Sequence, residues 1–445
     1  MKRKIIFGTV FLLLLSGVRG LAQQDPGGLT LSLEEARDYA IAHNLAVINA
    51  RADVEASKAA LWETISAALP QVNMSGSFAN NLKLMTTLLP GEFFGQPGTK
   101  IPVTFGSQFN TSASMDASLL LFNAPLYIGI ETTKLAGKLA QQNLQKSELD
   151  IKESVSASYF LILVTEKSLQ LLDGNLANMK ELLTSTRSMF AAGMAESTDI
   201  DQMVMNLTQV ENSRSSLERT IELNYNILRF QLGISMETPL KLSETLESLT
   251  ESINVEALMS QEFDHRQNID YRLVEGQEMI SELSLKSQKA STLPTLAGFY
   301  NYGKNGMGDK INDQRWFDNS MIGLNISVPI LAGGQRNSKI RQARINLEKA
   351  RTTKAMVADQ LLLQEKQLRY NLVNANLQYL SHKDNLEVSR RVYESTENKF
   401  KQGMASSIEL TQANNQFLQA ETSYVTALMD LLQTKVALDK LLNNL

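Results

Sequence analysis

Few residues of this chain have types and spacings that could perform catalysis or bind a metal. The three histidines, His43, His265 and His382, lie far apart in the sequence and share no metal-ligand spacing. Cysteine is absent, and the chain contains no phosphate-binding loop and no nucleophile elbow. We therefore expect no enzymatic activity, no metal and no cofactor.

The charge of the chain limits its partners. The sequence has 43 Lys and Arg against 47 Asp and Glu, which gives a formal net charge of −4. Nucleic-acid binding requires clustered basic residues, so we expect no nucleic-acid partner.

Two carboxylates lie at positions where their negative charge would stabilise a helix start rather than take part in catalysis. Glu409 ends the segment Ser406-Ser407-Ile408-Glu409, which has the pattern of a capping box at the start of a helix. Asp199 is expected in the first turn of another helix, where a carboxylate also suits the helix dipole. The residues alone therefore predict a capping role for both carboxylates.

These positions belong to a sequence that consists of two similar halves. The segment Phe190–Ala195 returns as Phe400–Ala405, 210 positions later, and Leu69-Pro70 returns as Leu293-Pro294, 224 positions later. The two offsets differ by 14 residues, so we expect an insertion of that length in the first copy, within residues 84–108. We expect a first repeat over residues 23–234, a linker over 235–254 and a second repeat over 255–445.

Each repeat contains a long stretch without proline. Residues 126–238 and 332–445 have none, and they are rich in helix-forming residues. The pattern predicts helical hairpins at about 125–232 and 333–442, turning at Gly193 and Gly403. A helix from about 125 to 192 would be about 100 Å long. A seven-residue repeat of large side chains, which predicts a coiled coil, includes Leu372, Tyr379, Leu386, Tyr393 and Phe400.

Between the predicted helices, apolar and polar residues alternate with a period of two. We predict strands at about 71–82, 111–122, 295–302 and 321–331, the last with Ile322, Leu324, Ile326 and Val328 on one face. Strands of about ten residues suit a membrane-spanning β-barrel, but four cannot close one. Three chains would supply twelve strands. A small soluble sheet packed on the helices is the alternative.

The N-terminus has the layout of a secretory signal peptide. Basic residues 2–4 precede an apolar run over 5–15, and small residues at Gly20 and Ala22 offer a cleavage site, so we expect a signal peptide over 1–22. The apolar run is too short to span a bilayer, which argues against an N-terminal anchor.

Taken together, these features resemble the TolC family of outer-membrane channel proteins. The resemblance rests on the duplicated halves, the Leu-Pro pairs, Leu331-Ala332-Gly333-Gly334 and the Phe400-x-x-Gly403 tip, and it covers residues 30–445. It implies a mainly α fold with a small β part: a homotrimer whose 12-stranded barrel spans the outer membrane and whose long helical barrel crosses the periplasm. It also implies an exit duct for efflux or secretion that works with a periplasmic adaptor protein and an inner-membrane pump.

The resemblance assigns roles by position. It places the pore constriction at Glu409, Gln412 and Asp199, although family members carry an acidic residue where Gln412 stands. The family latches Asp199 with a tyrosine and an arginine, which are Phe400 and Ala405 here, so Lys399 or Lys401 are candidate substitutes. It places the adaptor contact at Gly193, Met194, Gly403 and Met404. Simple helix capping and a bare helix-ending turn are the alternatives for these residues.

Two other functions remain open at this point. Within the family, the chain could be a type I protein-secretion channel, because the pump chooses the cargo. Outside it, the chain could be a periplasmic coiled-coil structural protein without a pore.

Overall fold

The computed structural model describes residues 28–251 and 253–445, and the expected signal peptide over 1–22 lies outside them. The chain divides into two compact units. Of the described residues, one unit, here called the tip unit, takes 28–43, 154–251, 253 and 381–432. The other, the sheet unit, takes 44–153, 254–380 and 433–445. The helices α3 (Ala124–Ala191), α8 (Gln335–Lys401) and α9 (Ser407–Leu441) contribute to both units.

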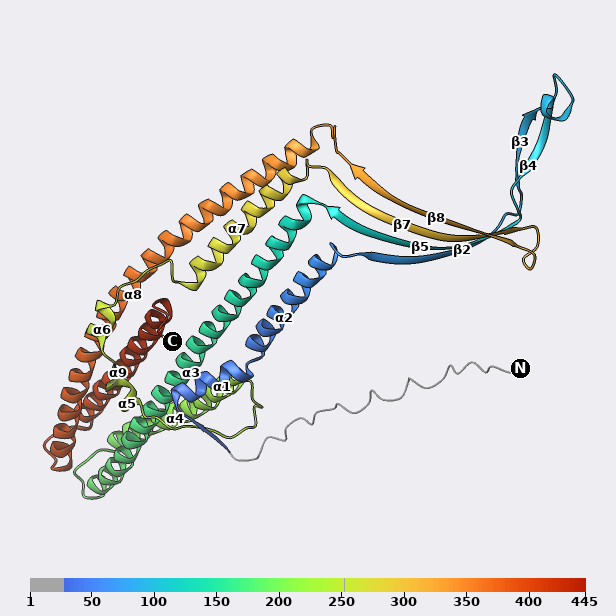
Figure 1. Ribbon diagram of the computed structural model, residues 1–445. Coiled ribbons are helices and arrows are strands. Elements are labelled where there is room, and N and C mark those ends of the chain that lie inside the picture. The colour runs from blue at the N-terminus through green and yellow to red at the C-terminus, as the bar shows by residue number, and fades with distance from the viewer. Residues whose placement is uncertain (1–27, 252) are drawn as a thin grey trace, which may run out of the picture. The chain divides into compact units, whose positions relative to one another are not determined.

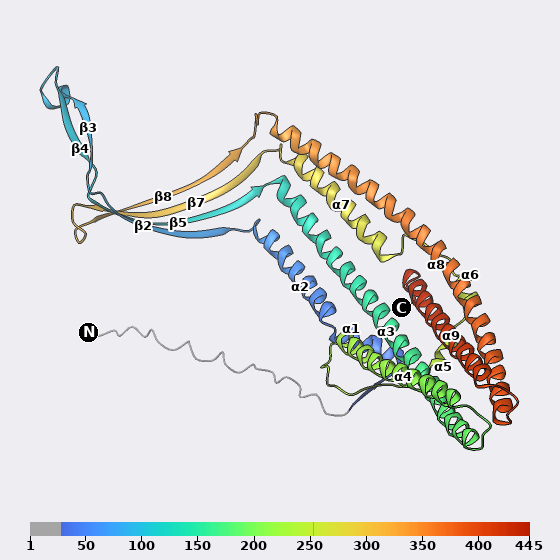
Figure 2. The ribbon, with the colours of Figure 1, turned by 180° about the vertical axis from the view of Figure 1, so that it is seen from behind.

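The sheet unit contains one antiparallel sheet of four strands in the order β2-β5-β7-β8 (Figures 1 and 2). Its strands are β2 (Gln71–Asn80), β5 (Phe109–Phe122), β7 (Thr295–Gly308) and β8 (Arg315–Ser327). The four predicted strands are therefore present, but the second pair extends further toward its connecting turn than residues 302 and 321 suggested. At its other end β8 stops at Ser327, because Pro329 has no N–H for a ladder. Val328, expected on that strand, lies just beyond it.

The segment over 84–108, where the insertion of the first copy was expected, has secondary structure of its own. It forms a second hairpin from β3 (Met85–Pro90) and β4 (Lys100–Phe105), joined through the short 3-10 helix η1 (Gly91–Phe94). Gly91, Gly95, Pro97 and Gly98 lie between the two strands, while the strands themselves include β-favouring residues such as Thr86 and Val103. The hydroxyls of Thr86 and Thr104 are 3.3 Å apart across this hairpin.

The rest of the sheet unit is helical. It includes α2 (Leu45–Ser66), α6 (Val255–Ser260) and α7 (Ile269–Ala290). The side chains of Asn44 and Asn268 cap α2 and α7 in the same way, accepting the backbone N–H two residues on at 2.8 and 2.9 Å. Arg369 of α8 donates to the backbone oxygens of Leu258 and Met259 at 3.0 and 2.6 Å, which fixes the segment after α6.

The tip unit is built from the far ends of α3 and α8 with α4 (Ser197–Leu232) and α9. The predicted seven-residue repeat forms its core, because Leu386, Tyr393 and Phe400 are buried together with Leu410 and Phe417. The rings of Tyr393 and Phe417 stack with their centroids 5.6 Å apart. Among the described helices, none has an apolar stretch long enough to cross a bilayer.

The expected linker is folded. Within the tip unit, β6 (Leu240–Leu242) pairs in parallel with β1 (Leu29–Leu31), next to α1 (Leu33–His43) and α5 (Leu246–Glu251). The hydroxyl of Tyr159 donates to the Leu31 carbonyl at 3.1 Å, and burial raises the pKa of Tyr159 to about 12. This buried hydrogen bond ties α3 to the β1–β6 pair.

Candidate functional site

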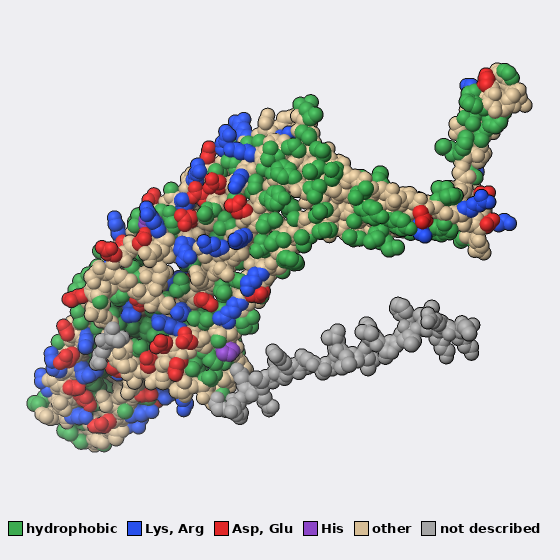
Figure 3. Space-filling view, viewed as in Figure 1, with side chains coloured by type: hydrophobic (Ala, Val, Ile, Leu, Met, Phe, Trp, Pro, Cys, Tyr) green, Lys and Arg blue, Asp and Glu red, His purple; other side chains and the backbone are tan. Residues whose placement is uncertain are grey.

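The four-stranded sheet has one face that is mostly apolar, apart from Lys304 and Asp318 toward the β7–β8 turn. The register aligns Val72, Ala117, Tyr300 and Ile322 across all four strands, so their side chains share a face. Other members of this face are Met74, Phe78, Met115, Leu119, Leu296, Leu324 and Ile326. On β8, the side chains of Ile322, Leu324 and Ile326 are 82, 65 and 65% exposed. Hydrophobic side chains gather over the strands in Figure 3.

The opposite face is mainly polar and internally hydrogen-bonded. The hydroxyls of Ser75 and Ser114 are 2.8 Å apart, and those of Ser77 and Ser112 are 2.7 Å apart. The amide of Asn301 donates to Asp116 at 2.5 Å. Apolar exceptions on this face include Leu120, Phe299, Met307, Phe317 and Met321. A sheet with one apolar and one polar face suits a wall between lipid and an aqueous pore.

Both edges of this sheet are open. The strands β2 and β8 occupy its two ends, and within the part of the chain that the structure describes each pairs on one side only. Unpaired edge groups are costly in lipid, where no water can replace the missing hydrogen bonds. Such a sheet can enter a membrane only when other strands complete it.

The two tips of the helical hairpins have the same local geometry. Gly193 and Gly403 end α3 and α8 with φ angles of 75° and 72°, a conformation that glycine adopts without strain. The next residues close each turn alike: Met194 N–H donates to the Met189 carbonyl and Met404 N–H to the Lys399 carbonyl, both at 2.8 Å. The side chains of Met194 and Met404 are 74 and 66% exposed. An adaptor contact at these four positions stays a prediction.

The predicted capping by both acidic residues is present. Glu409 accepts the Ser406 N–H at 2.9 Å, and the Ser406 hydroxyl accepts the Glu409 N–H at 3.3 Å. Asp199 accepts the Glu196 N–H at 2.9 Å at the start of α4. Gln412 is exposed on α9. That these side chains line a pore constriction stays a prediction.

The structure corrects the expected partner of Asp199. The second carboxylate oxygen of Asp199 accepts a hydrogen bond from the buried hydroxyl of Ser407, in the first turn of α9. Lys401, one of the two candidate cations, instead pairs with Glu181 at 2.9 Å and Glu397 at 3.0 Å. These carboxylates raise the pKa of Lys401. A lysine therefore does not latch Asp199 through position 401.

Sequence analysis did not single out Ser407, because a serine of the Ser406-Ser407 pair is expected simply to cap its own helix. Ser406 is the capping residue. Ser407 is one position further into the helix, which turns its hydroxyl away from the cap and toward α4. Only the packing of α4 against α9 reveals this contact.

An amphipathic sheet with open edges, attached to long helical hairpins, is the architecture of a channel-forming outer-membrane protein. Comparison with protein families agrees: residues 36–260 and 281–444 match the model of the outer membrane efflux protein family, and the chain belongs to that family.

Individual relatives are distant. The chain is 21% identical over 416 residues to the outer membrane protein TolC of Vibrio cholerae serotype O1, covering 90% of this chain and 87% of that protein. It is 24% identical over 216 residues to the proteases secretion protein PrtF of Dickeya chrysanthemi, a match that spans only 46% of this chain and 45% of PrtF.

Solved structures show the same fold. The outer membrane protein VceC of Vibrio cholerae superposes with a TM-score of 0.71 at 13% identity, covering 92% of this chain and 95% of VceC. The CmeC outer membrane channel of Campylobacter jejuni superposes with a TM-score of 0.72 at 15% identity, covering 92% of this chain and 85% of CmeC.

Proposed function

We propose that this protein is the outer-membrane exit duct of a tripartite efflux or secretion system and works as a homotrimer. The observation that carries the proposal is the four-stranded sheet, with its lipid-compatible face, its polar face and its two unpaired edges. In this proposal three copies close a barrel of twelve strands, in which each β2 pairs with the β8 of a neighbouring copy.

The same proposal determines which side chains of β8 contact lipid. Ile322, Leu324 and Ile326 contact lipid, and Val328 lies at the membrane boundary beyond the strand. The serine and asparagine side chains of the opposite face line the aqueous lumen. The protein resides in the outer membrane, and its helices extend from there into the periplasm.

We also propose that the two sequence repeats, 23–234 and 255–445, are structural repeats. The matched asparagine caps at Asn44 and Asn268 and the matched turns at Gly193 and Gly403 support this division. With three copies, six such hairpins would form the helical part of the duct.

The energy for transport comes from partners in this proposal. A periplasmic adaptor contacts the turns at Gly193-Met194 and Gly403-Met404, where exposed methionines offer flexible apolar surface. An inner-membrane pump supplies the work. Acidic rings at the tip, from Glu409 and Asp199, define the narrowest part of the duct and favour cations.

Protein secretion is the second candidate within the same architecture. The similarity to the proteases secretion protein PrtF favours it, whereas the similarity to CmeC-type channels gives it no support. Identifying the pump that co-purifies with the protein distinguishes the two, because the pump selects the cargo.

The oligomeric state tests the proposal. Mass measurement of the detergent-solubilised protein is expected to give three copies. Because the chain has no cysteine, paired substitutions on the two edges, Val72→Cys on β2 and Ile322→Cys on β8, place single thiols for cross-linking. A stable membrane-inserted monomer, or a soluble trimer that needs no detergent, would refute the proposal.

A further inference from the structure

A carboxylate is buried in the tip unit without a partner. The side chain of Glu421, on α9, is only 6% exposed. Among the residues that the structure describes, none forms a hydrogen bond or ion pair with it. Burial raises the pKa of Glu421 to about 7, and the Arg390 guanidinium only partly opposes this effect. An unpaired buried carboxylate is costly, so its retention calls for a role.

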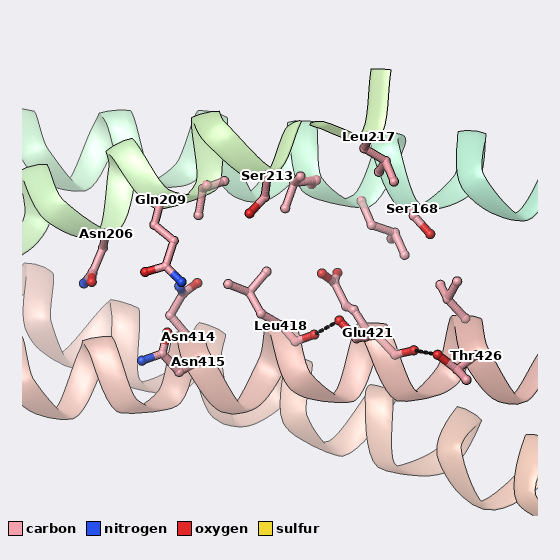
Figure 4. Close-up of a pocket in the computed structure, with 15 residues that line it drawn as sticks. Ser168, Asn206, Gln209, Ser213, Leu217, Asn414, Asn415, Leu418, Glu421 and Thr426 are labelled. Carbon is pink, nitrogen blue, oxygen red and sulfur yellow. Dashed lines mark hydrogen bonds between the residues drawn. The ribbon is translucent and has the colours of Figure 1, made fainter. Parts of the chain in front are cut away.

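Glu421 borders a cavity of about 340 Å³ between α9 and the α3–α4 hairpin. Figure 4 shows its carboxylate directed from α9 toward α3 and α4, opposite Ser213. Much of the wall is hydrocarbon, contributed by Leu171, Leu172, Val210, Leu217, Leu418 and Val425. The volume lies within the range of pockets that hold small organic ligands.

The polar groups of the wall are mostly committed elsewhere. The hydroxyls of Ser168, Thr422 and Thr426 donate to carbonyls of their own helices at 3.0, 2.9 and 2.8 Å. Asn414 accepts from the amide of Asn175 at 2.7 Å, and the amide of Asn206 donates to Thr411 at 3.1 Å. These five side chains therefore each have a polar group engaged away from Glu421, and Gln209, Ser213 and Asn415 are the remaining polar residues of the wall beside Glu421.

The neighbouring charges do not compensate Glu421 either. Arg390 and Glu394 of α8 and Lys167 of α3 border its other side, and α4 contributes no charged residue to the cavity. Lys167 is held by Glu247 at 2.6 Å, and Arg390 is an exposed side chain. The cavity therefore presents one carboxylate, a wall that is partly hydrocarbon and partly uncharged polar, and no cation among its lining residues.

We propose that this cavity binds a small organic cation, with its ammonium group against Glu421 and its hydrocarbon part against the surrounding leucines. Such a ligand supplies the missing positive charge and fills the cavity at the same time. A hydrated metal ion fits less well, because the wall offers a single carboxylate and is in large part hydrocarbon. The site goes beyond the proposed function and does not depend on conduction.

Binding requires ionised Glu421, so protons compete with the ligand. With a pKa of about 7, roughly nine-tenths of the carboxyl groups are ionised at pH 8 and roughly one-tenth at pH 6. The apparent affinity is therefore expected to fall about tenfold between these pH values.

Isothermal titration with benzyltrimethylammonium, using the full chain in a non-ionic detergent, tests the site. The parent protein is expected to show one saturable site per chain. Glu421→Gln, which keeps the shape and removes the charge, is expected to weaken binding at least tenfold. Ser213→Trp keeps the carboxylate but fills the cavity, and it is expected to abolish binding. Glu387→Gln, at an exposed carboxylate of α8, is the matched control and should bind as the parent does.

Three results would overturn the proposal. They are the absence of saturable binding to the parent protein, equal binding by Glu421→Gln, and an equal loss in Glu387→Gln, which would indicate general charge attraction. Conductance and trimer mass of the same preparations are measured in parallel, so failure of the site is distinguishable from failure of the channel.

Discussion

Glu421 gives a quantitative prediction for the pH dependence of stability. Its pKa is about 7 in the folded chain, against an ordinary value of 4.5. The folded chain therefore holds this proton more tightly than the unfolded chain does. The contribution of Glu421 to stability is most favourable below about pH 4.5, declines as the pH rises, and levels off above about pH 7.

The size of the effect follows from the shift. Each pKa unit corresponds to about 1.4 kcal/mol, so the shift from 4.5 to about 7 costs about 3 kcal/mol per chain at pH 8. Glu421→Gln removes the titrating group. It is expected to raise the free energy of unfolding by up to about 3 kcal/mol at pH 8 and by much less at pH 5.

Denaturant unfolding of the detergent-solubilised protein, followed by circular dichroism at both pH values, measures this difference. Glu387→Gln loses an exposed pair with Arg391 that is 2.9 Å long, and it should change stability by less than about 1 kcal/mol at either pH. If Glu421→Gln destabilises the protein, or shifts stability equally at pH 5 and pH 8, the assignment of an unpaired buried carboxylate is wrong.

Three further predictions concern the channel. Leu324→Arg should reduce membrane insertion, costing about 2–4 kcal/mol if the residue lies near the bilayer midplane. Asn325→Arg, on the opposite, mainly polar face of the sheet, should insert normally, and outer-membrane fractionation would show both results. Glu409→Gln should lower cation preference and weaken block by multivalent cations in bilayer recordings, and unchanged selectivity would leave only the capping role. Ser407→Ala removes the hydroxyl that donates a hydrogen bond to Asp199, a contact worth about 1 kcal/mol. Single-channel recordings should therefore show modestly more frequent opening. Unchanged opening would show that this hydrogen bond takes no part in gating.

Much of the fold could be predicted from the sequence because its signals are periodic and long. The seven-residue repeat placed Leu386, Tyr393 and Phe400 in one core, and the alternation around Ile322 identified a strand. The capping-box residues Ser406 and Glu409 act locally, so their sequence neighbours suffice to identify them.

The features that were not predicted depend on local composition or tertiary contacts rather than on a periodic sequence pattern. Residues 84–108 were expected only to hold an insertion, and β3 and β4 were not foreseen because glycine and proline dominate the centre of the segment. The partner of Asp199 was sought among cations, but helix packing supplied the hydroxyl of Ser407. Glu421 drew no attention, because a glutamate in a long helix is ordinarily solvent-exposed and only the packing of α9 on α3 and α4 buries it.

The central claim is that three copies of this chain form one continuous aqueous duct. Conductance of the purified protein in a planar lipid bilayer tests this most directly. The account predicts discrete, cation-preferring channel openings whose unit corresponds to one trimer. A preparation of correctly folded trimers that inserts into the bilayer but never conducts, even when Ser407→Ala loosens the tip, would contradict it.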